Sequence, residues 1–332
     1  MKPQRLALFD TLKGVAILMV CITHFAWERQ ERIDLLFPFW ISMAVPIFMI
    51  VTGYLTAASY ERKQYGLRQL YSAEALLPKL AQYLRPFTLM FLAELVLELL
   101  CKGSLPSLRE TVRCYLEGGI GKYGTYYVPV LLQMLVLFPL IYAVIRKNRH
   151  GVWLCFAVNL LYELNKDALG IDSHDSRLLA FRYIFLISMG CYLYFDRQQL
   201  HLGKYALLLA VGVGYIHLIS YTAYKPVIFT RWNATSMMTA FYIAPIIALL
   251  LKDAPQLRLP PFTALGRASY HIFLAQILYY NYFRHALPVE NRMARMVLGV
   301  GLCLLSGLLF HALDRKLPSL RRILRPDTSI SA

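Results

Sequence analysis

The chain has 332 residues, of which 58% are hydrophobic, 14% aromatic and only 16% charged. Soluble globular proteins carry about 25% charged residues, and a mean hydropathy of +0.48 is more than one buried core can absorb, so we exclude a soluble protein. The formal net charge of +16 is therefore interpreted loop by loop against a bilayer, and not as a sign of nucleic-acid binding.

Ten apolar segments are candidates for transmembrane helices, because a spanning helix needs about 20 mostly apolar residues. In chain order they are residues 8–27, 35–58, 80–101, 124–145, 151–165, 178–195, 204–224, 232–251, 264–284 and 295–313. The fifth is short, and the sixth and ninth carry Arg182 and His271, so nine or eleven spans stay open. We expect an all-α polytopic fold, with a single membrane domain over 1–332 and a short disordered tail at about 325–332.

The first segment resembles a signal peptide only superficially. Asp10 and Lys13 interrupt its start, and no small-residue cleavage site follows it. We therefore interpret it as a retained helix. With the N-terminus inside, most of the Lys and Arg residues face the cytoplasm, which favours cytoplasmic termini at both ends. The basic loop at 102–122 argues the other way.

The six cysteines give no sign of a disulfide framework or a metal site. They are scattered, form no CxxC pair and lie mostly inside apolar runs. Zinc ribbons and disulfide scaffolds need regular, closely spaced cysteines. We expect no metal site in this chain.

The first segment carries ionisable residues, which are costly within a bilayer and are functional candidates by default. Lys13 and His24 are eleven residues apart, which in a helix is three turns plus roughly 20°, with a separation of about 16 Å along the axis. They would thus share one face, and Asp10 could hold the Lys13 ammonium through an i,i+3 contact. The alternative is that Lys13 extends to the interface and His24 is a hydrogen-bonded structural histidine.

At this point the chain resembles the integral membrane acyltransferase family 3, the O-acetylases of sugars and related acceptors. The resemblance runs in order from about residue 8 to 315, and five segments carry it. These are FDTLKGVAILMVCITHF (9–25), VPIFMIVTGYL (45–55), YLRPF (83–87), TYYVPVLLQMLVLFPLI (125–141) and LGRASYHIFLAQ (265–276). Two departures are clear: the family more often has Arg at the position of Lys13, and many members have His at that of Gln276.

The resemblance implies transfer of an acyl group, most often acetyl, from acyl-CoA to a hydroxyl. An imidazole with an ordinary pKa of about 6.5 is suited to take the hydroxyl proton. We therefore expect His24 to be the base, or to carry the acyl group in a transient adduct. Lys13 would bind the anionic donor or stabilise the oxyanion, and Asp10 would hold Lys13.

Further candidates follow from the resemblance and from the charge pattern. The expected acyl-CoA contacts are Arg85, Arg267, Arg62 and Lys63. Arg62 and Lys63 could instead act only in setting topology, whereas Arg85 and Arg267 are favoured because each lies within a family-like motif at a helix entrance. The expected acceptor contacts are Tyr54, Glu94, Ser269 and Tyr270. Glu94 and Glu98, one turn apart, could equally bind water or basic loop groups, whereas Thr52–Gly53 favours close helix packing. His271, His217 and His311 are expected to be structural.

The resulting prediction is a multi-pass protein of the bacterial plasma membrane that O-acylates a cell-envelope or exported glycan. Its expected partners are the acyl-CoA donor, the hydroxylated acceptor and the lipid bilayer, with acetyl-CoA as co-substrate, no tightly bound cofactor and no nucleic acid. A proton-coupled secondary transporter is the alternative from another class. An inactive membrane scaffold of the same fold is the third possibility.

Overall fold

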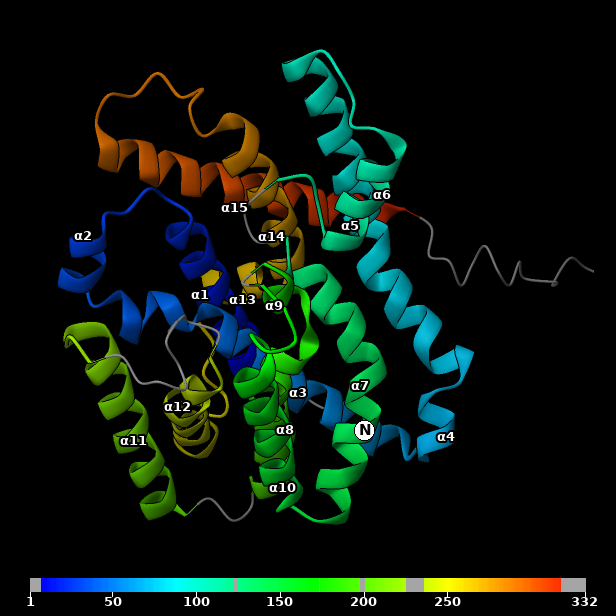
Figure 1. Ribbon diagram of the computed structural model, residues 1–332, viewed down its shortest axis with the longest axis vertical. Helices are drawn as coiled ribbons and strands as arrows, with labels where there is room; N and C mark the ends of the chain where they lie inside the picture. Colours follow the sequence, from blue (N-terminus) through cyan, green and yellow to red (C-terminus); the bar gives the residue numbers. More distant parts are fainter. Residues whose placement is uncertain (1–6, 122–124, 173, 198–200, 225–235, 318–332) are drawn as a thin grey trace, which may run out of the picture. The chain divides into compact units, whose positions relative to one another are not determined.

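The computed structural model describes residues 7–121, 125–172, 174–197, 201–224 and 236–317 (Figure 1). These residues form helices, turns and loops and contain no strand, which confirms the predicted all-α class for the described part. The predicted tail at 325–332 and residues 232–235 of the eighth candidate lie outside the described residues.

The chain divides into two compact units, each made from two separate stretches of sequence. Unit 1 comprises residues 1–65 and 137–269, and unit 2 comprises residues 66–136 and 270–332. The helix α7 (Tyr127–Lys147) and the short helix α14 (Ser269–Leu278) each cross the boundary along the chain. The two units are described separately below.

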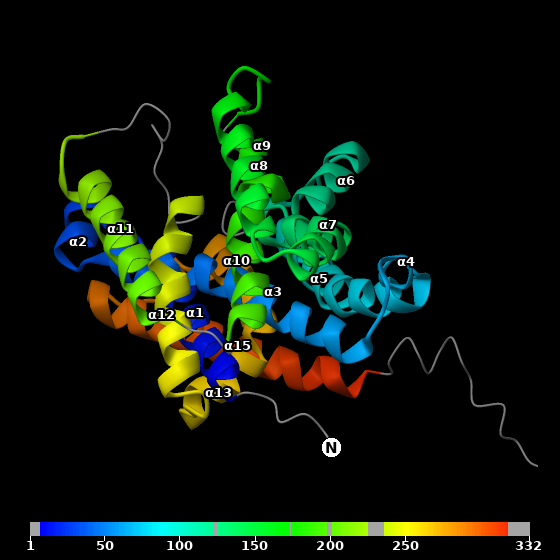
Figure 2. The ribbon, with the colours of Figure 1, turned by 90° about the horizontal axis from the view of Figure 1, so that it is seen from below.

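Unit 1 contains most of the helices. They are α1 (Ala7–Thr23), α2 (Arg29–Asp34), α3 (Ala44–Lys63), α8 (Gly151–Asn165), α9 (Asp175–Leu178), α10 (Ile184–Asp196), α11 (Leu202–Tyr221), α12 (Ala240–Asp253) and α13 (Pro260–Arg267). Short 3-10 turns at Phe37–Phe39 and Ile41–Met43 precede α3. Figure 2 shows α11 and α12 side by side.

Unit 2 is built around one long helix from each of its two stretches. The first stretch holds α4 (Leu67–Leu70), α5 (Ala73–Lys102) and α6 (Leu108–Glu117), and the second holds α14, a π-helical turn at Tyr279–Phe283 and α15 (Arg292–Lys316). Gly307 of α15 packs directly on α14, since a Cβ there would lie 2.3 Å from the Ile272 Cα.

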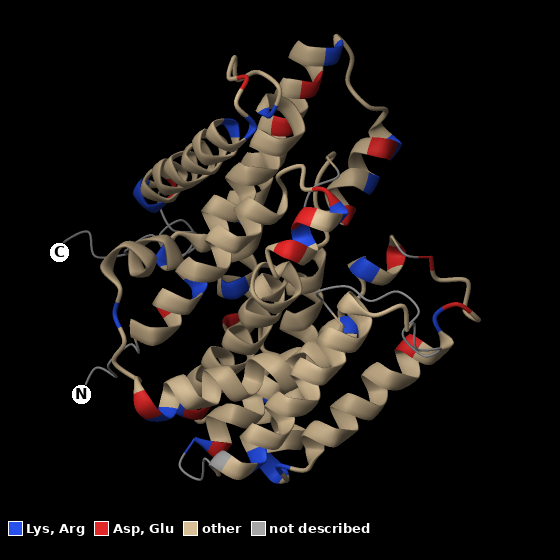
Figure 3. Ribbon diagram, turned by 90° about the vertical axis from the view of Figure 1, so that its left-hand side faces the viewer, with Lys and Arg blue, Asp and Glu red and all other residues tan. Residues whose placement is uncertain are grey.

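Four helical segments of the described chain are long and apolar enough to cross a bilayer. They are Phe37–Lys63, Tyr127–Lys147, Gly203–Tyr221 and Arg292–Lys316. Long stretches of helix carry no charged residue, as Figure 3 shows. Together with the composition, these segments make the chain a membrane protein, whereas the count of ten spans and the orientation stay predictions.

Several predicted spans differ from the observed helices, and the first, second and ninth are examples. The first helix ends at Thr23, not at residue 27, and His24 lies in the turn that follows. The second begins with 3-10 turns, where Leu36 is in the left-handed region (φ 55°) and Pro38 lies two residues later in the first turn. The ninth is broken at Ala268, which ends α13 with ψ near 4° before α14 begins.

Glycines set the closest helix contacts of unit 1. A Cβ on Gly53 of α3 would lie 2.0 Å from the Ile187 carbonyl oxygen, and one on Gly190 of α10 would lie 1.9 Å from the Ile50 carbonyl oxygen. Neither overlap can be relieved by moving a side chain, so α3 and α10 can approach this closely only through glycine. This confirms the expectation that Thr52–Gly53 permits close packing.

Candidate functional site

The ionisable residues of α1 form a cluster with the end of α13 inside unit 1. Asp10 is almost fully buried, and its Oδ1 lies 3.0 Å from the Lys13 Nζ. Its Oδ2 lies 3.5 Å from the Arg267 Nε, whose side chain is 54% exposed. The structure therefore shows the expected Asp10–Lys13 contact and adds a second cation to the same carboxylate. We call these three residues the Asp10 cluster.

The backbone contact between α1 and α13 explains why this cluster forms. A Cβ on Gly14 would lie 1.9 Å from the Phe262 carbonyl oxygen, and one on Gly266 would lie 1.7 Å from the Asp10 carbonyl oxygen. Thr11 adds a buried hydroxyl contact of 3.2 Å to Thr263. Small residues at these positions bring the two backbones together, which places Arg267 beside Asp10.

His24 lies just beyond the end of α1 and is half-buried. The turn that holds it is closed by two bonds to the last turn of the helix: the Phe25 N–H donates to the Ile22 carbonyl at 3.1 Å, and the Trp27 indole donates to the same oxygen at 2.8 Å. The backbone around the imidazole is thus fixed from both sides.

The other predicted residues of unit 1 lie on α3 and do not join the Asp10 cluster. Tyr54 is buried, with its ring 4.5 Å from that of Phe9 and 5.4 Å from that of Tyr194. Arg62 and Lys63 are exposed in the last turn of α3. Cations at this position suit a helix C-terminus, where the backbone dipole is negative.

A second buried carboxylate, Asp314, organises unit 2. Its Oδ1 lies 2.9 Å from the Arg85 Nη2, its backbone oxygen accepts from the same guanidinium, and its Oδ2 lies 3.1 Å from the His271 Nε2. The His271 Nδ1 lies 3.2 Å from the His311 Nδ1. We call these four residues the Asp314 cluster, and it joins α5, α14 and α15.

The hydrogen bonds of the Asp314 cluster fix the proton positions on its two imidazoles. A carboxylate only accepts, so the His271 Nε2 carries a hydrogen toward Asp314. In neutral His271 the Nδ1 then accepts, and the hydrogen between the rings belongs to the His311 Nδ1. This assignment leaves the His311 Nε2 as the basic nitrogen at the end of the chain.

Glu94 and Glu98 of α5 occupy a polar region of unit 2. Glu94 is fully buried, and its Oε2 accepts from the Ile120 backbone N–H at 3.0 Å. Glu98 accepts from the Lys102 ammonium and from the Tyr282 hydroxyl, the latter at 2.9 Å. These partners fit the alternative stated for the pair, in which the carboxylates bind groups of the neighbouring loop and of basic residues.

The LGRASYH segment divides between the two units. Ser269 is buried at the start of α14, and the Tyr270 hydroxyl donates to the Tyr83 carbonyl at 3.0 Å. Gln276 is fully buried, and neither side-chain amide atom has a hydrogen bond among the described residues. A buried amide in this state is a place where a water or a ligand group would be expected.

Sequence reasoning missed the Asp314 cluster. It assigned His271 and His311 to structural roles and did not consider Asp314 as their partner. The signal was present but weak: Asp314 is three residues after His311, which puts both on one side of a helix. The link to His271, 43 residues away, follows only from the tertiary fold.

Comparison with protein families matches residues 6–312 to the family described as Acyltransferase domain. Comparison with curated proteins and with solved structures gives no match. The family match extends over both units and includes all five segments on which the resemblance was based. The chain therefore belongs to the integral membrane acyltransferase family 3.

Proposed function

We propose that this membrane acyltransferase transfers an acyl group, acetyl in the simplest case, from acyl-CoA to a hydroxyl of a cell-envelope or exported glycan, with His24 as the base. The observation that carries the proposal is the Asp10 cluster on the family-matched first helix. It gathers two fixed cations around one carboxylate next to the helix that leads to His24.

The proposed reaction needs a base and a place for negative charge. His24 takes the proton of the acceptor hydroxyl as its oxygen attacks the thioester carbonyl. The carbon–sulfur bond then breaks, the acyl group stays on the acceptor oxygen, and the proton passes to the departing CoA thiolate. Lys13 of the Asp10 cluster is about 16 Å along the helix axis from His24, so the cluster is proposed to hold the anionic part of the donor at a distance from the thioester.

The Asp10 cluster supports binding of an anionic donor. Asp10 neutralises one of its two cations, so the cluster keeps a surplus positive charge, and the Arg267 side chain is partly exposed. Arg62 and Lys63 add exposed cations at the end of α3 in the same unit. Arg85 is less suited to the donor, since Asp314 already holds its guanidinium.

The acceptor class is proposed from family membership. Of the predicted acceptor contacts, Tyr54, Glu94 and Ser269 are all buried, so none of them offers a side chain to bulk water.

The test is acyl transfer by the purified protein in lipid nanodiscs, supplied with acetyl-CoA and a panel of glycans. Release of free CoA and acetylated glycan is expected, and His24→Ala should reduce the rate by about 100- to 10,000-fold, the usual contribution of a general base. His217→Ala is the matched control, because His217 lies exposed on α11 and stacks on Tyr221. Transport of a solute without CoA release would contradict the proposal.

The sidedness of the reaction needs a separate measurement. Right-side-out vesicles loaded with acetyl-CoA are given an acceptor on the outside only. Acetylation of the external acceptor is expected if donor and acceptor enter from opposite faces. Acetylation only when both substrates share one compartment would remove the transmembrane route and leave the proposed chemistry intact.

A further inference from the structure

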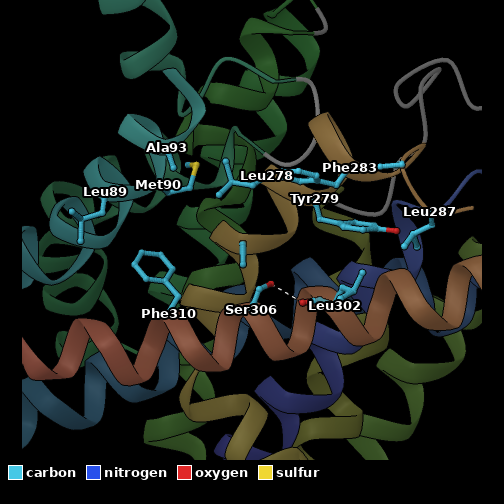
Figure 4. A pocket seen from close by; sticks show the side chains of 12 residues that line it. Leu89, Met90, Ala93, Leu278, Tyr279, Phe283, Leu287, Leu302, Ser306 and Phe310 are labelled. Atoms are coloured by element: carbon cyan, nitrogen blue, oxygen red, sulfur yellow. Dashed lines mark hydrogen bonds between the residues drawn. The ribbon is translucent and has the colours of Figure 1, made fainter. Parts of the chain in front are cut away.

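Unit 2 contains an apolar cavity of about 480 Å³ that the proposed chemistry does not use. Figure 4 shows its walls, which come from α5, α14, the π-helical turn, the loop after it and α15. Leu89 and Phe310 line one part and Tyr279 and Leu287 another. A cavity of this volume is within the range that binds small ligands in proteins.

The chemistry of the walls selects an aliphatic ligand. Ser306 and Tyr279 are the lining residues with a polar side-chain atom. The Ser306 hydroxyl is already bonded to the Leu302 carbonyl of its own helix, at 2.6 Å (Figure 4). A polar ligand would therefore lose its hydration with little return, whereas a hydrocarbon chain that enters from the bilayer loses none.

The dimensions of the cavity fit one lipid chain. Its lining residues on α15 run from Leu302 to Phe310, which is about 12 Å along a helix. That is close to the depth of one leaflet, half of a hydrocarbon core of about 30 Å. The cavity opens at its edges, where Leu89 is 39% and Leu302 44% exposed, so a chain can enter from the surrounding bilayer.

Positive charge lies at the loop end of the cavity. Arg284 and His285 are placed between the lining residues Phe283 and Ala286, and the Arg284 Nε donates to the His285 Nε2 at 2.6 Å. Arg295 holds the same loop by donating to the Val289 carbonyl at 2.9 Å. This loop is on the predicted outer side, where Lys and Arg are normally less frequent, and its positive charge is complementary to that of an anionic headgroup.

The turn that joins the loop to α14 is itself unusual. Tyr279–Phe283 is π-helical, and such turns are frequent at functional sites. Tyr279 lies against Gly299 of α15, where a Cβ would lie 2.4 Å from the tyrosine hydroxyl. The sequence thus keeps a wide turn and a glycine together where they shape one wall of the cavity.

We propose that this cavity binds one acyl chain of an anionic phospholipid from the outer leaflet, with the lipid phosphate at Arg284. The apolar walls accept the chain and the cationic loop selects the headgroup. The site is independent of the acyl-transfer reaction, because it requires neither His24 nor acyl-CoA.

The test is lipid-dependent thermal stability of the purified full chain in detergent. Phosphatidylglycerol is titrated against phosphatidylcholine with the same acyl chains, and a larger rise in the unfolding midpoint is expected with phosphatidylglycerol. Ala93→Trp places a ring in the cavity and should raise the phosphatidylglycerol concentration needed by about tenfold, since the ring takes up space that the acyl chain would fill and a tenfold change needs only about 1.4 kcal/mol of binding free energy. Leu92→Trp is the matched control, because Leu92 is exposed on the same helix and does not line the cavity.

The headgroup is tested with Arg284→Gln, which should make phosphatidylglycerol no better than phosphatidylcholine. Arg109→Gln, on α6, is its control and should keep the preference. Equal stabilisation of the unmodified protein by the two lipids would overturn the proposal, as would an unchanged titration in Ala93→Trp. If Ala93→Trp does not fold, native mass spectrometry of Arg284→Gln must show loss of co-purified phosphatidylglycerol, and its retention would equally overturn the proposal.

Discussion

The Asp10 cluster of unit 1 and the Asp314 cluster of unit 2 have the same plan with different partners. In each, a buried carboxylate receives one basic group through each oxygen. Both groups at Asp10 are permanent cations. At Asp314 one is the Arg85 guanidinium and the other an imidazole, which passes its hydrogen bonding on to His311.

This difference separates two uses of a buried acid. A carboxylate that contacts both a lysine and an arginine leaves a surplus positive charge in the cluster, which suits an anionic ligand such as CoA. A carboxylate between an arginine and a histidine can be electrically balanced when the histidine is neutral. The second arrangement suits a stable connection between helices, so we place the chemistry at the first cluster and a structural role at the second.

The largest effect on the two clusters is expected from Gly266→Val. The added side chain would overlap the Asp10 backbone, separate α1 from α13 and remove Arg267 from the Asp10 cluster, at a cost of about 3 kcal/mol or more. The measurement is the yield of monodisperse protein and its unfolding midpoint. Gly301→Ala is the control: nothing lies within 4 Å of a Cβ there, and alanine in a helix should be neutral or slightly stabilising. Equal behaviour of the two variants would contradict the packing argument.

Replacing each carboxylate by its amide tests the contrast in charge. Asp10→Asn leaves two fixed cations side by side and should lower stability by about 3 kcal/mol. Asp314→Asn leaves one cation and a neutral imidazole, and should cost about half as much. Thermal unfolding of the two variants in the same detergent gives the comparison. Adding Lys13→Met to Asp10→Asn should recover part of the loss, and no recovery would mean that charge is not the cause.

Changes at Lys13 sharpen the assignment of the positive cluster to donor binding. Lys13→Met should raise the KM for acetyl-CoA by about tenfold, the effect of losing one charge-assisted contact of about 1.4 kcal/mol. Lys13→Arg keeps the charge and should stay within about threefold of the original protein. Initial rates at varied acetyl-CoA concentration distinguish the two. A loss in Lys13→Arg as large as that in Lys13→Met would show that geometry, and not charge, is what the donor requires.

The smallest effect is expected from the imidazole at the end of the Asp314 cluster. His311→Gln keeps a hydrogen-bond donor toward His271 and should change the rate of acyl transfer by less than about threefold, because structural substitutions away from a reacting centre have small effects. The full pH–rate profile is measured alongside, and its shape should not change. A loss comparable with that of His24→Ala would move the base from unit 1 to unit 2.

Much of the fold could be predicted from hydropathy, because apolar runs of about 20 residues are costly outside a membrane or a helix bundle. The predicted segments therefore fall on helices throughout the described chain. The errors are local. Hydropathy does not register backbone geometry, so it missed the turn after Thr23, the 3-10 start at Pro38 and the break at Ala268.

Contacts within the candidate site could be predicted from the sequence only where the residues are close together in the chain. Asp10 and Lys13 are one helical turn apart, and helix geometry alone predicts their contact. Arg267 could be placed at the site only through family resemblance, since its meeting with Asp10 depends on Gly14 and Gly266 in distant segments. His271 and Asp314 lacked both signals, and for that reason their pairing went unpredicted.

On either side of the interruption at Ala268, the LGRASYH segment contributes one residue to the Asp10 cluster and one to the Asp314 cluster. Three residues separate Arg267, which contacts Asp10, from His271, which contacts Asp314. Deleting one residue between them would turn the following helix by about 100°. His271 would then lose its contact with Asp314, whereas Arg267 would keep its contact with Asp10. This short stretch is therefore where the chain has least freedom to change length, and where a laboratory insertion or deletion would do damage far beyond its size.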